Sequence, residues 1–279
     1  MNLPYSNALA ILNKYDLKAD KSLGQNFLQE PEYLEAISQA ADIAPGDTVL
    51  EIGPGLGSLT RYLSLLAQSV TAVELDHDLI PVLQDILTPY PNVKIIEGDI
   101  LRISPSSLFG TSSYLVVANV PYYITSAIFR HLLDSNPRPK RIVLTVQKEV
   151  AERICAKPGD LSLLALSVQI FGTPEIVKII PAEAFFPIPK VDSAVIRVEM
   201  ESTPLIAPEL INTFFHLAKA GFSQKRKNLR NSLSAGLRLS TSETNGMLLN
   251  CSIDPIRRAE TLSIKEWSIL THEYLQLIK

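Results

Sequence analysis

The chain has 279 residues, 46% of them hydrophobic and 20% charged, so it is long enough for one large or two modest domains with a full core. Its formal net charge of −3 excludes a protein that is basic throughout, and any charge that binds nucleic acid must therefore be local. Without a secretory signal or an apolar run of membrane-spanning length, the sequence predicts a soluble cytoplasmic protein with no membrane partner. The two cysteines and four histidines lack metal-ligand spacing, which predicts no bound metal.

A strand, a glycine loop and a helix follow one another in the first part of the chain. Helices are predicted at 4–15 and from Pro31 onward. Residues 48–52 (TVLEI) then predict a buried strand that runs into the glycine loop 53–57 (GPGLG), and helical spacing follows over 58–67. In this arrangement the backbone can approach a ligand closely at the beginning of a helix.

Polar residues follow the next strands at the points where these strands end. The strands are predicted at 69–75, 93–97 and 114–118. Glu74, Asp99 and Asn119 lie at or just after their ends. Because the carboxyl ends of parallel strands meet at one edge of an open sheet, we expect these side chains to share a ligand site with Gly53. Glu74, 21 positions after Gly53, is placed to accept two ribose hydroxyls.

The glycine loop by itself fits two nucleotide-type cofactors. Its pattern is G-x-G-x-G, with Ser58 at the position of the third glycine of the NAD pattern. No acid–base pair for hydride transfer is apparent, whereas a motif suited to an amine follows at 119–122. These two observations favour S-adenosylmethionine over NAD.

The tetrad Asn119-Val120-Pro121-Tyr122 has the groups that an exocyclic amine needs in order to react. The lone pair of adenine N6 is delocalised into the ring, so the amine is a poor nucleophile. The Asn119 side-chain oxygen and the Pro121 carbonyl can each accept one N6–H, while Tyr122 stacks on the base. An isolated N-x-P-Y is more often a plain strand end with a turn, but the nucleotide-type site upstream favours the catalytic interpretation.

The second half of the chain begins as an α/β pattern and ends as helices. Predicted elements are a helix at 125–133, a strand at 141–146, a helix at 148–156, and an antiparallel strand pair at 176–180 and 194–200. A proline-rich segment separates the two strands of that pair. After a linker at 201–208 the sequence predicts four or five short helices, and the last begins at a capping box of Ser263 and Glu266.

A stretch of the C-terminal part is basic. Residues 211–242 contain no acidic side chain but six positive ones, Lys219, Lys225, Arg226, Lys227, Arg230 and Arg238. A helix that carries Lys225 to Lys227 and Arg230 near its beginning can bind phosphates along one face. The alternative is a solvated helix face, which is a common reason for a run of charge.

Five segments, in order and spread over almost the whole chain, resemble one family. They are 21–28 (KSLGQNFL), 51–57 (EIGPGLG), 119–122 (NVPY), 185–193 (FFPIPKVDS) and 222–231 (FSQKRKNLRN). The family is the ribosomal RNA adenine N6,N6-dimethyltransferases, and the bacterial small-subunit type resembles the chain best. No segment is decisive alone, but five in the right order are very specific.

The resemblance implies an α/β fold of the class I S-adenosylmethionine-dependent methyltransferase type (Rossmann-like) with a small all-helical C-terminal domain. We therefore expect a catalytic domain at 1–203, with 1–30 as a cofactor and target segment, and a helical RNA-binding domain at 204–279. The methyl donor would be S-adenosylmethionine. The substrate would be two adjacent adenosines in the 3′-terminal hairpin loop of small-subunit (16S) rRNA, each dimethylated by a monomeric enzyme on an immature 30S particle.

The resemblance also assigns roles to residues. The cofactor would be bound by Asn26, Leu28, Gly53, Glu74, Asp99 and Asn119, with Glu74 on the ribose and Asp99 on the adenine amine. The catalytic residues would be Asn119, Pro121, Tyr122 and Phe185, with Phe185 closing on the base opposite Tyr122. The basic stretch, and not the resemblance, supplies the expected RNA-binding residues, which are Lys225, Arg226, Lys227 and Arg230. Phe185 has a plainer alternative, which is packing in the core under the proline-rich segment.

Two rival functions remain at this point. The large-subunit rRNA adenine methyltransferases that confer macrolide resistance share the tetrad and the glycine loop, although the segment 222–231 and the extended helical tail favour the small-subunit type. A non-catalytic RNA-binding assembly or transcription factor on a methyltransferase fold is the other rival. The intact Gly53, Asn119 and Tyr122 argue against such a loss of activity.

Overall fold

The computed structural model describes the chain except residues 1–2, 4, 225 and 279. It divides into two compact units. One unit combines Met1–Ala151 with Pro174–Met200, and the other combines Glu152–Thr173 with Glu201–Lys279. Residues 152–173 belong to the same compact unit as the helices at the end of the chain, so the compact units do not coincide with the two predicted domains. The functional boundary predicted between residues 203 and 204 stays a prediction.

The first unit is built on a sheet that has, within the described residues, seven strands in the order β4-β3-β2-β5-β6-β9-β7. Its strands are β2 (Thr48–Ile52), β3 (Ser69–Glu74), β4 (Val93–Glu97), β5 (Leu115–Asn119), β6 (Arg141–Gln147), β7 (Gly172–Ile180) and β9 (Ser193–Met200). The strands from β4 to β6 pair in parallel, and β9 runs antiparallel to β6.

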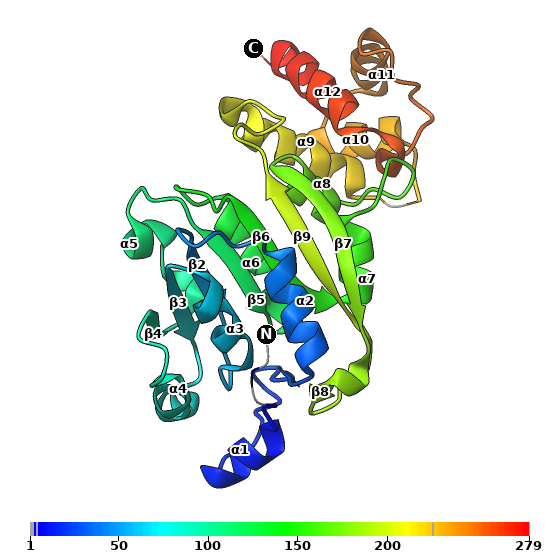
Figure 1. Ribbon diagram of the computed structural model, residues 1–279. Helices are drawn as coiled ribbons and strands as arrows, with labels where there is room; N and C mark the ends of the chain where they lie inside the picture. Colours follow the sequence, from blue (N-terminus) through cyan, green and yellow to red (C-terminus); the bar gives the residue numbers. More distant parts are fainter. Residues whose placement is uncertain (1–2, 4, 225, 279) are drawn as a thin grey trace. The chain divides into compact units, whose positions relative to one another are not determined.

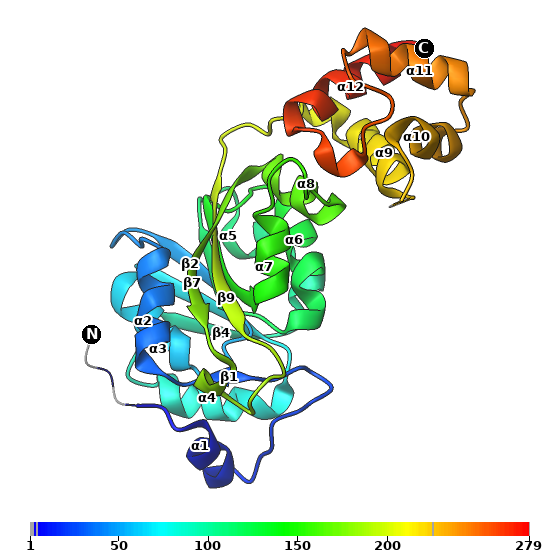
Figure 2. The ribbon, with the colours of Figure 1, turned by 90° about the vertical axis from the view of Figure 1, so that its right-hand side faces the viewer.

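Helices cover both faces of this sheet, and its central strands are therefore largely buried and rich in apolar residues. The helices of this unit are α1 (Ala8–Lys14), α2 (Pro31–Ala40), α3 (Ser58–Leu66), α4 (Ile80–Leu87), α5 (Pro105–Phe109), α6 (Thr125–Leu133) and the beginning of α7 (Lys148–Ile154). Figures 1 and 2 show α2 and α3 on one face and α6 on the opposite face. Four of the five residues of β5 are buried as a result, which explains why the sequence predicts this strand so clearly.

The strand order changes direction between β2 and β5. From β2 the chain proceeds outward through β3 and β4, and it then returns to place β5 on the other side of β2. Such a reversal opens a crevice at the carboxyl ends of the two neighbouring strands, where ligands bind in open α/β sheets. Gly53 follows β2 and Asn119 ends β5, so the topology brings these two predicted site residues together.

A second, two-stranded sheet joins the N-terminal segment 21–28 to the proline-rich segment 185–193. Phe27–Leu28 (β1) pairs antiparallel with Phe185–Phe186 (β8), and the paired residues are Phe27 with Phe186 and Leu28 with Phe185. Strands of two residues leave no periodic pattern, so the sequence did not predict this pairing. The small sheet brings two of the family-like segments together beside the larger sheet.

The second unit is helical. Its helices are the end of α7, α8 (Leu163–Gln169), α9 (Ile211–Phe222), α10 (Leu229–Leu237), α11 (Thr241–Asn250) and α12 (Ile264–Leu277). Trp267 is completely buried at its centre, and α9 approaches α10 so closely that a Cβ on Gly236 would lie 2.6 Å from the Ala220 Cβ. The capping box predicted for Ser263 and Glu266 is confirmed at the beginning of α12.

Two structural properties of the described residues concern metals and membranes. No cluster of three or more histidine, cysteine or carboxylate side chains among them has a geometry that could hold a metal ion. None of the helices in this part of the chain is both long enough and apolar enough to cross a membrane.

Candidate cofactor and target site

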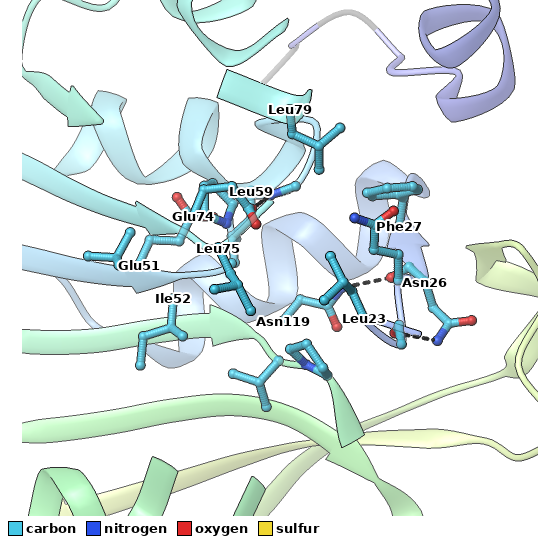
Figure 3. Close-up of a pocket in the computed structure, with 18 of the residues that line it drawn as sticks. Leu23, Asn26, Phe27, Glu51, Ile52, Leu59, Glu74, Leu75, Leu79 and Asn119 are labelled. Atoms are coloured by element: carbon cyan, nitrogen blue, oxygen red, sulfur yellow. Dashed lines mark hydrogen bonds between the residues drawn. The ribbon is translucent and has the colours of Figure 1, made fainter. Parts of the chain in front are cut away.

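A pocket opens at the carboxyl edge of the large sheet, beside the switch between β2 and β5 (Figure 3). Eight of the predicted site residues line it: Asn26, Leu28, Gly53, Glu74, Asp99, Asn119, Pro121 and Tyr122. They come from the N-terminal segment and from the ends of β2, β3, β4 and β5. The predicted convergence of strand ends is thus present, although the role of each residue remains a prediction.

The glycine loop leaves free space where side chains would otherwise stand. Gly53 has φ +67°, and no atom lies within 4 Å of the position that a Cβ would take. Gly55 has φ +59°, and a Cβ there would lie 3.0 Å from the Phe27 ring. The left-handed backbone and the close ring both require glycine, and the gap beside Gly53 lets a ligand approach the main chain.

Glu74 is fixed by the main chain around it. Its Oε2 accepts the Gly55 N–H at 3.0 Å and its Oε1 accepts the Asp76 N–H at 2.9 Å. Burial raises the pKa of Glu74, and these two hydrogen bonds oppose the rise. Each carboxylate oxygen keeps a second lone pair, so the side chain can accept two further donors such as a pair of ribose hydroxyls.

Asp99 lies just after β4 at the edge of the pocket. Its Oδ1 accepts the Leu101 N–H at 3.0 Å, and its Oδ2 lies 3.4 Å from the Arg102 Nε. The side chain is about one-third exposed. It therefore retains free acceptor positions for an amine at the pocket.

The sequence prediction missed Glu51, which also lines the pocket. This side chain is 1% exposed, and its Oε2 has no hydrogen-bond partner within the described part of the chain. Burial raises the pKa of Glu51 to about 8, the nearby Thr60 hydroxyl opposes the rise, and the charge of Glu74 adds to it. The signal was present in the sequence, because a carboxylate stands among the apolar residues Val49, Leu50 and Ile52 of a buried strand.

The charge of the pocket fits S-adenosylmethionine better than NAD. Glu74 and Asp99 are in the lining beside the buried Glu51, whose raised pKa favours its neutral form, whereas none of the described lining residues is lysine, arginine or histidine. A pyrophosphate would meet carboxylates without a counter-charge, while a sulfonium and an ammonium group would be attracted by them. Together with the open space beside Gly53, the acidic lining fits the cationic cofactor.

Asn119 is oriented by the N-terminal segment. Its Nδ2 donates to the Asn26 carbonyl at 3.1 Å, as Figure 3 shows, and the Asn26 side chain in turn donates to the Gly24 carbonyl at 3.0 Å. Which amide atom is nitrogen follows from this network, since only nitrogen can donate to a carbonyl. The Asn119 Oδ1 is thereby left as an acceptor in the pocket.

The rest of the tetrad turns directly after β5. Pro121 precedes a short 3₁₀ helix, Tyr122–Ile124, and its carbonyl accepts the Ile124 N–H at the long distance of 3.3 Å. That carbonyl keeps a lone pair for a further donor. The Tyr122 hydroxyl is hydrogen-bonded at 2.7 Å to the Ser193 Oγ, and burial raises the pKa of Tyr122 while this bond opposes the rise. The sequence prediction had assigned no partner to the tyrosine hydroxyl.

Phe185 does not lie in the pocket lining. It is 1% exposed and belongs to the core cluster beneath the sheet, where its backbone pairs with Leu28. The plainer alternative, packing in the core, describes this position. The geometry gives no support to a Phe185 ring that faces Tyr122 across a base.

The predicted RNA-binding residues lie mostly before a helix and not within one. Arg226 and Lys227 are exposed in the turn between α9 and α10, and Arg230 is in the first turn of α10. Asn228 caps that helix and its side chain accepts the Asn231 N–H at 3.0 Å. Lys225 lies outside the described residues.

A family model described as ribosomal RNA adenine dimethylase matches residues 16–270. The chain belongs to the ribosomal RNA adenine dimethylase family. As a member, it is an S-adenosylmethionine-dependent methyltransferase, and the pocket at the strand ends is the place where its residues fit that cofactor.

Curated members of the adenine dimethylase family are similar over nearly their full length. A "Ribosomal RNA small subunit methyltransferase A" of Dehalococcoides mccartyi (strain CBDB1) is 46% identical over 96% of this chain and 93% of the relative. A protein of the same name from Alkaliphilus oremlandii is 41% identical over 94% of each chain.

Solved structures agree with the class I methyltransferase fold that the sequence predicted. A dimethyladenosine transferase from Plasmodium falciparum superposes with a TM-score of 0.76 at 26% identity, over 90% of this chain and 98% of the other. The 23S rRNA methyltransferase ErmE superposes with a TM-score of 0.72 at 27% identity, over 89% of this chain and 99% of the other. The fold is thus shared by a dimethyladenosine transferase and by a 23S rRNA methyltransferase, so the fold alone does not select the RNA.

Proposed function

We propose that this chain dimethylates N6 of two adjacent adenosines in the 3′-terminal hairpin loop of small-subunit rRNA. The sequence identity of 39–46% to proteins named "Ribosomal RNA small subunit methyltransferase A" supports the small subunit, and not the large one, as the substrate. The proposal extends to an immature 30S particle as substrate, to a monomeric enzyme and to action in the cytoplasm, where ribosomal subunits are assembled.

The observation that carries the chemistry is the orientation of Asn119. Because its Nδ2 donates to the Asn26 carbonyl, its Oδ1 is available to accept one N6–H of the target adenine. The Pro121 carbonyl is the second acceptor, since among the described residues it accepts the long bond from Ile124 and keeps a free lone pair. Two acceptors draw charge onto the amine nitrogen and fix its direction, while Tyr122 supplies a face for the base.

S-adenosylmethionine, when bound, supplies a methyl group that its sulfonium already activates. The protein therefore needs alignment and polarisation and no covalent intermediate. The first transfer would replace one N–H of the amine by N–CH₃, with S-adenosylhomocysteine as the leaving group and the proton released to solvent, so only one of the two acceptors is engaged in the second. A second transfer requires that the site leave the monomethylated amine room to rotate.

Methyl transfer from tritiated S-adenosylmethionine tests the proposal. Unmethylated small subunits, mature small subunits and large subunits are compared as substrates, and the product nucleoside is identified by mass spectrometry. We expect N6,N6-dimethyladenosine only in the unmethylated small subunits. Label in large-subunit rRNA would support the macrolide-resistance type instead, and the absence of label in every substrate would support a non-catalytic factor.

A further inference from the structure

Tyr122 is held at two points, its side-chain hydroxyl and its main-chain carbonyl. Its hydroxyl shares a hydrogen bond of 2.7 Å with the Oγ of Ser193, 71 residues further along the chain. At the backbone end, the Thr125 hydroxyl donates to the Tyr122 carbonyl at 3.1 Å. Tyr122 is one of the residues that line the pocket. The plane of its ring is therefore set by a residue of another strand as well as by its own turn.

Ser193 is itself rigidly placed. It is the first residue of β9, lies opposite Gln147 of β6, and is completely buried. Asp192, the residue before it, accepts two hydrogen bonds. Its carbonyl accepts the Lys148 N–H at 3.0 Å, and its carboxylate accepts the Ala182 N–H at 3.2 Å. A hydroxyl on such a strand cannot follow a moving ring, so it fixes the ring to the sheet.

We propose that Ser193 is a positioning residue that holds the Tyr122 ring in the plane from which it stacks on the target adenine. The inference rests on the proposed function, since it needs a target base in the pocket. A tyrosine without this bond could turn about its side-chain torsions, and the ordering of the ring would then be required at each binding event. A ring that is ordered in advance favours the aligned complex.

This role differs from a merely structural one in its consequences. If the bond served only to satisfy two buried hydroxyl groups, its loss would lower stability and leave the rate of the folded enzyme unchanged. If Ser193 acts through Tyr122, its loss lowers the rate, and it has no further effect once the tyrosine hydroxyl is gone.

A double-mutant cycle of Ser193→Ala and Tyr122→Phe separates these two roles. The measurements are single-turnover methyl transfer to unmethylated small subunits and the affinity for S-adenosylmethionine by calorimetry. We expect each single variant to lower the rate by about 3- to 10-fold, which corresponds to one hydrogen bond. The double variant should be no slower than the slower single variant, and cofactor affinity should change by less than about twofold.

Two matched controls remove similar hydroxyls elsewhere. Ser38→Ala removes a buried hydroxyl that donates to the Glu35 carbonyl at 2.8 Å, and Tyr114→Phe removes one that donates to the Pro137 carbonyl at 3.3 Å. Neither residue lines the pocket, so both controls should keep the wild-type rate. If Ser193→Ala does not fold, Ser193→Cys, with its similar shape and weak hydrogen bonding, replaces it in the same cycle.

The results that overturn the inference are distinct from those that overturn the proposed function. A folded Ser193 variant with the wild-type rate, or losses that multiply in the double variant, would refute the role of Ser193. A wild-type protein that labels no small-subunit RNA would instead refute the proposed function itself.

Discussion

Replacing Glu51 by glutamine is expected to flatten the pH dependence of the free energy of unfolding. In the folded protein burial raises the pKa of Glu51 from 4.5 to about 8. Between these values the unfolded chain has lost this proton while the folded chain retains it. The folded state thus binds more protons, and the free energy of unfolding falls as the pH rises through this window.

The size of the effect follows from the two pKa values. Below the unfolded value both states are protonated and Glu51 has no pH effect, whereas above the folded value its full penalty is present. Between about pH 5.5 and about pH 8 the linkage amounts to a loss of roughly 3 kcal/mol in the wild type. Glu51→Gln should lack this loss, even if a buried amide shifts its stability by a constant amount.

Urea unfolding at several pH values measures this difference. Circular dichroism follows the whole chain, while the fluorescence of Trp267, the single tryptophan, reports the helical unit and serves as an internal reference. Glu183→Gln removes an exposed carboxylate and should retain the wild-type pH dependence. If the free energies of unfolding of the wild type and Glu51→Gln differ by the same amount at every pH, the raised pKa assigned to Glu51 is wrong.

Three further predictions concern the site and the basic turn. Asn119→Ala should abolish methyl transfer in a folded protein, because an acceptor for the reacting amine is removed; a near wild-type single-turnover rate would contradict its role. Glu74→Ala should weaken S-adenosylmethionine and S-adenosylhomocysteine alike by about 1–3 kcal/mol, since two hydrogen bonds to a carboxylate disappear, and calorimetry should find no NAD binding to either form. Neutralising Arg226, Lys227 and Arg230 together should lower the slope of log affinity for small subunits against log salt by somewhat under about one unit for each phosphate that the protein no longer binds. Cofactor affinity is the control for that last variant, and an unchanged slope would mean that these charges are only a solvated surface.

The sequence by itself determined those elements that depend on neighbouring residues. The strands at 48–52 and 93–97 have the predicted bounds, and the helix at 125–133 does also, because apolar spacing and flanking polar residues encode local conformation. The capping box at Ser263 is of the same kind, since both of its partners lie within one turn. The convergence of Gly53, Glu74, Asp99 and Asn119 followed from a rule of parallel sheets and needed only the strand ends.

Tertiary structure alone decided the contacts between distant segments. The pairing of Phe27–Leu28 with Phe185–Phe186 buries Phe185, although the resemblance had placed that ring on the target. The bond from Tyr122 to Ser193 and the raised pKa of Glu51 likewise arise only when separate strands pack and exclude water. Short strands and single hydrogen bonds leave no periodicity in the sequence, because their partners are chosen by the packing of the whole sheet and not by adjacent residues.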